Sequence, residues 1–136
     1  MTRETRKAFH QALICGGVVA LVIATVLMVS RQPAGADELR LPIVELRSQA
    51  AELELLRAQS GAADVTPRFA RLHAQQLAKA IDASREELAA MQVDPPLADA
   101  RASATALATQ LAAAVHRPDA TLPIAPLQAL ETSLQR

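Results

Sequence analysis

Two histidines in the C-terminal part of the chain, His73 and His116, could together bind a metal or a haem. If their helices were antiparallel neighbours, both residues would lie at a similar height along the helix axes. His73 lies close to the apolar stripe of its own segment, whereas His116 lies about 140° around the helix from Leu111. The rings would point in different directions, so no metal site and no cofactor are predicted. A position in the last helical turn, where a cation interacts favourably with the helix dipole, accounts for His116.

Carboxylates and hydroxyls are the other groups that could carry out catalysis. The carboxylates occur in close pairs whose members point in different directions on a helix, so they are not aimed at one substrate atom. These pairs are Glu52 and Glu54, Glu86 and Glu87, and Asp94 and Asp99. The serines lie outside any Gly-x-Ser-x-Gly turn, and the four glycines form no phosphate-binding loop. The sequence therefore predicts a protein that is not an enzyme.

The composition excludes two further classes of site. The single cysteine, Cys15, cannot form an intramolecular disulfide and leaves no thiolate metal site. From Asp37 onward the chain has ten basic and thirteen acidic residues, no run of basic residues, and neither Trp nor Tyr. Nucleic-acid binding requires clustered basic side chains, usually with aromatic rings for stacking. No nucleic-acid partner is expected.

Residues 12–29 form an uncharged apolar run that dominates the N-terminal part of the chain. Eighteen helical residues span roughly 27 Å, close to the thickness of a bilayer hydrocarbon core. We interpret the run as a transmembrane signal anchor that follows a short cytoplasmic tail, residues 1–11. Basic residues just before the run favour a cytoplasmic N-terminus and a periplasmic C-terminal domain. The expected location is the bacterial inner membrane.

Cleavage of this segment is the alternative. Ala34-Gly35-Ala36 resembles a signal-peptidase site, and cleavage after Ala36 would release a soluble periplasmic protein. The apolar run is longer than a typical signal peptide, which favours retention. Residues 30–41 contain Pro33 and Gly35 and show no strong periodicity, so they are expected to form a linker.

Small residues recur every fourth position within the apolar run, a spacing that lets two membrane helices approach closely. The predicted helix-pairing residues are Ala12, Gly16, Ala20 and Ala24.

Residues 42–136 are expected to fold as a helical domain. The first helix should begin at Pro42 and stop at Gly61, with Ile43, Leu46, Ala50, Leu53 and Leu56 on its apolar face. Thr66 and Pro67 give the clearest start signal, that of the second helix. Its apolar stripe contains Ala70, Ala74, Leu77, Ile81, Ser84, Leu88 and Met91, with Phe69 at the edge.

Asp94-Pro95-Pro96 is expected to open a third helix that ends at Arg117-Pro118. Its predicted stripe is Leu97, Ala100, Ala104, Leu107, Leu111 and Ala114, and a short fourth helix over residues 126–136 presents Leu127, Leu130 and Leu134. The predicted fold class is all-α: one transmembrane helix followed by a three- to four-helix antiparallel bundle or a helical hairpin.

Because the sequence shows no set of catalytic residues, the surfaces of the helices are the remaining candidates for a functional site. The expected function is that of a membrane-anchored accessory or scaffold subunit of a bacterial envelope complex, acting by protein–protein binding, with a partner protein or a second copy. The alternative is a ligand-binding or chaperone-like protein released into the periplasm. A sensory role would need a partner to carry the signal across the membrane.

Overall fold

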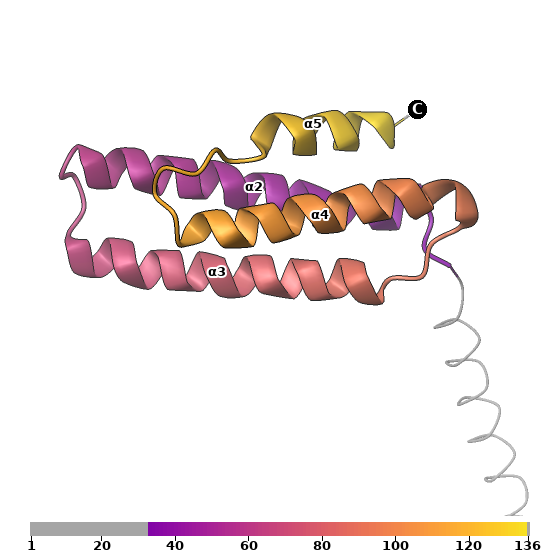
Figure 1. The fold of residues 1–136 in the computed structure, drawn as a ribbon, viewed down its shortest axis with the longest axis horizontal. Coiled ribbons are helices and arrows are strands. Elements are labelled where there is room, and N and C mark those ends of the chain that lie inside the picture. Colours follow the sequence, from indigo (N-terminus) through magenta and orange to yellow (C-terminus); the bar gives the residue numbers. More distant parts are fainter. Residues whose placement is uncertain (1–32, 136) are drawn as a thin grey trace, which may run out of the picture. The chain divides into compact units, whose positions relative to one another are not determined.

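The computed structural model describes residues 33–135, which form an all-α bundle of four packed helices. The four are α2 (Ala36–Gly61), α3 (Pro67–Ala90), α4 (Ala98–Val115) and α5 (Ile124–Ser133), and a short 3₁₀ turn η1 (Pro95–Leu97) precedes α4. The first three run alternately up and down, and α5 lies along α2 (Figure 1). This confirms the helical bundle predicted from the sequence.

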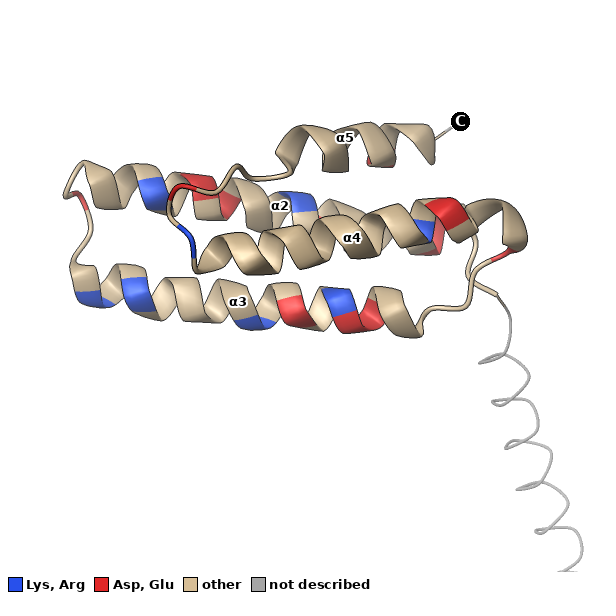
Figure 2. Ribbon diagram, in the orientation of Figure 1, with Lys and Arg blue, Asp and Glu red and all other residues tan. Residues whose placement is uncertain are grey.

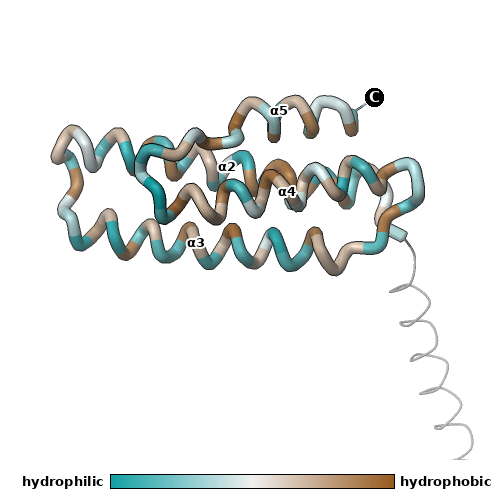
Figure 3. The backbone as a smooth tube through the Cα atoms, viewed as in Figure 1, coloured by the Kyte–Doolittle hydropathy of each residue, from teal (hydrophilic) through white to brown (hydrophobic). Residues whose placement is uncertain are grey.

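Apolar side chains from all four helices form one continuous core. Figure 3 shows hydrophobic and hydrophilic positions alternating along each helix, as amphipathic helices require. The buried set contains every predicted apolar position of the first helix, and the predicted interior residues Leu77, Ile81 and Leu88. Its members are Leu39, Ile43, Leu46, Ala50, Leu53, Leu56, Leu77, Ile81, Leu88, Ala104, Ala108, Leu111 and Leu127.

The start of α2 differs from the expectation. The helix begins at Ala36 rather than at Pro42, so residues 36–41, assigned above to the linker, are helical. Gly35 is the N-cap, and its amide donates to the carboxylate of Glu38. Pro42 therefore lies inside the helix, where it removes one backbone hydrogen bond. Burial of the Leu39 side chain and of Pro42 itself offsets that loss.

The turn between α2 and α3 also differs in detail, because Gly61 is the last helical residue and not the left-handed one. Ala63 occupies the left-handed region, with φ 60°. Its amide donates to Ser60 O at 3.3 Å, and the amide of Asp64 donates to Gln59 O at 2.9 Å. These two bonds define a Schellman motif, which usually has glycine where this chain has alanine.

The N-terminus of α3 agrees with the prediction. Thr66 Oγ1 accepts a hydrogen bond from the amide of Phe69 at 3.3 Å, and Pro67 takes the first helical position. Ser84 is buried within the stripe, where its hydroxyl accepts from the side-chain amide of Gln49 at 3.4 Å. Phe69 is 52% exposed, consistent with its place at the edge of the stripe.

The later helices are shifted by small amounts. Asp94-Pro95-Pro96 forms the 3₁₀ turn, and α4 proper begins at Ala98. Within α4 the core position expected for Leu107 is taken by Ala108, and Leu107 is only partly buried. α5 begins two residues before Pro126 and ends at Ser133. An alanine at the α4 seam lets the helix backbones approach closely.

Candidate binding groove

A groove opens where α4 stops short of the hairpin that α2 and α3 form. The two hairpin helices contain 26 and 24 residues, whereas α4 contains 18. At 1.5 Å per residue, α4 is shorter by about 9 to 12 Å, or roughly two turns. Figure 1 shows the hairpin continuing beyond the last turn of α4. The inner faces of α2 and α3 are therefore left without a covering helix at this end.

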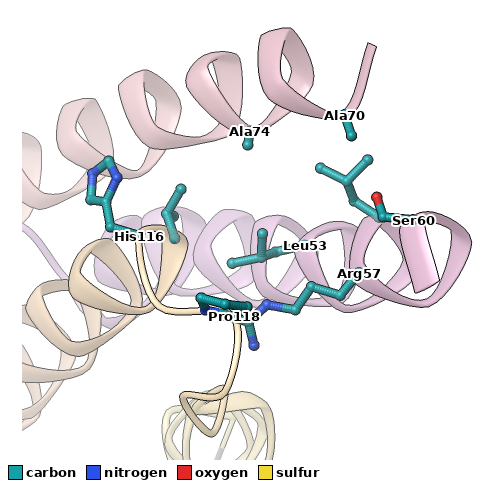
Figure 4. A pocket seen from close by; sticks show the side chains of 9 residues that line it. Leu53, Arg57, Ser60, Ala70, Ala74, His116 and Pro118 are labelled. Carbon is teal, nitrogen blue, oxygen red and sulfur yellow. The ribbon is translucent and has the colours of Figure 1, made fainter. Parts of the chain in front are cut away.

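The groove has a volume of about 380 Å³ and is largely apolar. We call it the hairpin groove. Its lining residues are Leu53, Leu56, Arg57, Ser60, Ala70, Ala74, Val115, His116 and Pro118. Figure 4 shows Ala70 and Ala74 of α3 facing α2 across the groove, with His116 at the end of α4. The small α3 side chains leave the room that a covering helix fills elsewhere in the bundle.

Arg57 holds one wall of the groove in place. Its guanidinium donates to three backbone carbonyls: Ala114 O at 2.7 Å, Arg117 O at 2.7 Å and Ala120 O at 2.8 Å. The last carbonyls of a helix have no partner within the helix, and a cation there also interacts favourably with the helix dipole. Arg57 thus joins α2 to the end of α4 and to the loop that follows it.

Basic residues surround the open end of the hairpin. Arg68 and Arg71 lie in the first turns of α3, and Arg117 follows α4, whereas Asp64 and Asp119 are the acidic residues of the adjacent loops. Figure 2 shows basic positions at this end of α3, further basic positions along the helix, and acidic positions only toward its other end. The uncovered apolar surface therefore has basic side chains beside it.

His73 and His116 lie in different places and make different contacts. His73 Nε2 lies 2.7 Å from Glu52 Oε1, and its ring stacks on Phe69 with centroids 5.5 Å apart. This contact joins α3 to α2 outside the groove. His116 is the C-cap of α4 and lines the groove. Between residues 33 and 135, no three His, Cys, Asp or Glu side chains converge as metal ligands would.

Neither the groove nor the role of Arg57 was predicted from the sequence, because both depend on how far α4 extends along the hairpin of α2 and α3. The predicted helix-pairing residues, Ala12, Gly16, Ala20 and Ala24, and the predicted anchor lie outside the described residues. None of the helices within residues 33–135 is long and apolar enough to span a membrane.

Comparison of the chain with protein-family models, with curated proteins and with solved structures finds no match.

Proposed function

We propose that this chain is a membrane-anchored accessory or scaffold subunit of a bacterial envelope complex, and that the hairpin groove binds a segment of a partner protein. The observation that carries the proposal is the uncovered apolar surface between α2 and α3. Exposed apolar surface of this kind marks sites of interaction. The apolar run at residues 12–29 supports the membrane anchor.

The groove favours a short amphipathic helix as its occupant. A third helix, α4, already packs on α3 and, less extensively, on α2. A partner helix of about two to three turns would continue that packing beyond Val115, with its apolar face on Leu53, Leu56 and Ala74. Acidic residues on its flank would be attracted to Arg71 and Arg117.

Features of the N-terminal end of the bundle favour retention of the anchor over cleavage after Ala36. Cleavage there would remove Ala34, whose amide donates to Gln92 O at 2.6 Å. It would also remove Gly35, the N-cap whose carbonyl accepts from the amide of Leu39 at 3.0 Å. The new terminal ammonium would lie at the start of α2, where the helix dipole disfavours positive charge.

Co-purification of the full chain in mild detergent tests the proposal. Ala74→Gln places a longer polar side chain in the groove, and Ala89→Gln is the matched control on an exposed position of α3. We expect a discrete partner to co-purify with the wild type and with Ala89→Gln, but not with Ala74→Gln. Equal recovery of the partner with both variants would contradict a role for the groove.

A further inference from the structure

Helix α3 has its charges in the order that its own dipole disfavours. Its first turn contains no acidic residue and its last turn no basic one. Instead Arg68 and Arg71 lie near the N-terminus, and Glu86 and Glu87 near the C-terminus (Figure 2). Helix N-termini favour negative charge and C-termini positive charge. Both ends of α3 thus have the charge that the helix dipole disfavours. This indicates that the charges have a role other than stabilising α3.

The charges lie on the side of α3 that faces away from the core. At 100° per residue, Arg68, Leu72 and Glu86 lie within about 30° of the direction opposite the buried stripe. We call this surface the outer face of α3, and it also contains Lys79 and Ala83. All five residues are exposed, and Leu72 is 52% exposed.

Ion pairs within the bundle do not neutralise the outer face. Arg85 binds Asp82 at 3.1 Å, but neither residue belongs to the outer face. Among residues 33–135, Arg68, Lys79 and Glu86 form no ion pair. The N-terminal half of α3 therefore has Arg68 and Arg71 without an ion pair among the described residues, the C-terminal half has Glu86 and Glu87, and Lys79 lies between them.

We propose that the outer face of α3 is a homodimer interface in which the α3 helices of two copies pack antiparallel. A twofold axis between Leu77 and Ala78 brings the basic half of each copy against the acidic half of the other. Such an interface uses the same surface on both copies, so one helix has to provide both signs. An anionic membrane or a nucleic acid would match the basic half but repel the acidic half.

The same axis gives the apolar side chain of the outer face a partner. It places Leu72 opposite Ala83 of the second copy, where the small alanine side chain leaves room for leucine. It also places Arg68 next to Glu86 of the second copy, one residue from the directly opposed position. One pair of helices about 36 Å long makes a small interface, so we expect weak association in free solution. Attachment of both copies to one membrane would raise their effective concentration and strengthen the association.

Disulfide cross-linking of the full chain in membranes tests the proposal. In a Cys15→Ser background, one tagged copy carries Leu72→Cys and a second copy, with a different tag, carries Ala83→Cys. Antiparallel pairing brings these two positions within the Cα separation of about 5.5 Å that a disulfide needs. We expect the Leu72→Cys copy to cross-link to the Ala83→Cys copy, and not to another Leu72→Cys copy. Absence of the mixed cross-link, or equal cross-linking of identical positions, would overturn the proposal.

Charge reversal provides the control for specificity. R68E with R71E makes both ends of α3 acidic, and E86R with E87R makes both ends basic. We expect mixed cross-linking within either form to fall about tenfold, and to recover when an acidic copy is combined with a basic copy. Circular dichroism checks that both forms remain helical. Cross-linking that is insensitive to these reversals would refute the role of the charges. The groove variant Ala74→Gln should leave the cross-link unchanged, so the result does not depend on the hairpin groove, although the membrane setting rests on the proposed anchor.

Discussion

Arg57 is the side chain on which the shape of the hairpin groove depends most. Its three carbonyl partners lie 57, 60 and 63 positions further along the chain. A helical pattern identifies neighbours three or four positions apart, so periodicity does not single out this arginine. The same limitation applies to Glu131, which is buried in α5 and lies 2.8 Å from Arg47 of α2.

Replacement of Arg57 should loosen the end of α4. Arg57→Met keeps much of the side-chain length but removes all three hydrogen bonds, each made by a charged donor. We expect the free energy of unfolding to fall by about 2 kcal/mol. The control is Glu54→Met at an exposed position of the same helix, which should change it by less than about 0.5 kcal/mol. Thermal unfolding followed by circular dichroism measures both. Equal melting temperatures would show that the three hydrogen bonds contribute little.

At the scale of the helices, the sequence predicted their existence and buried faces better than their ends. Periodicity located the interior of α2 and α3 because each buried stripe repeats over many turns. The predicted start of α2 is wrong because it relied on the preference of proline for the first helical position, whereas Gly35 and Glu38 form the cap of a helix that begins six residues earlier. Gly35 is a less specific signal than serine or threonine at an N-cap. Periodicity alone did not show whether Leu107 or Ala108 is buried, because that depends on how closely α4 approaches its neighbours.

Two opposite substitutions at the end of α2, Ala63→Gly and Gly61→Ala, test which residue has the left-handed conformation. Ala63 has φ 60°, which glycine adopts without strain, so Ala63→Gly should raise the free energy of unfolding by roughly 1 kcal/mol. Gly61 is helical, and an added Cβ would meet no atom within 4 Å. Gly61→Ala should therefore also be stabilising, by about 0.5 to 1 kcal/mol. Chemical denaturation of the two variants checks this. Destabilisation by both changes would indicate that Gly61, and not Ala63, is the left-handed residue.

At the scale of the whole molecule, the groove results from unequal helix lengths. Its lining comes from α2, α3, the end of α4 and the loop after it. The sequence suggested which residues of each helix are apolar, but not which of them α4 covers. Which of these residues α4 covers depends on how the helices are aligned along their axes. The contact of Glu52 with His73 shows that alignment for α2 and α3. Leu53 and Leu56 were correctly predicted to be apolar-face residues, yet their place in a groove required the packed structure.

Protection of one groove position in native membranes tests the central claim most directly, namely that the hairpin groove is occupied by a partner. In a Cys15→Ser background, Ala74→Cys reports on the groove and Ala89→Cys on exposed surface of the same helix. Each is treated with a membrane-impermeant maleimide, once as protein purified free of its partner and once in spheroplasts of the source cells, where the reagent reaches the periplasmic side. We predict that Ala74→Cys reacts readily when purified but is protected in the membrane, whereas Ala89→Cys reacts in both. Equal reactivity of Ala74→Cys in the two settings, with Ala89→Cys accessible in both, would contradict the account.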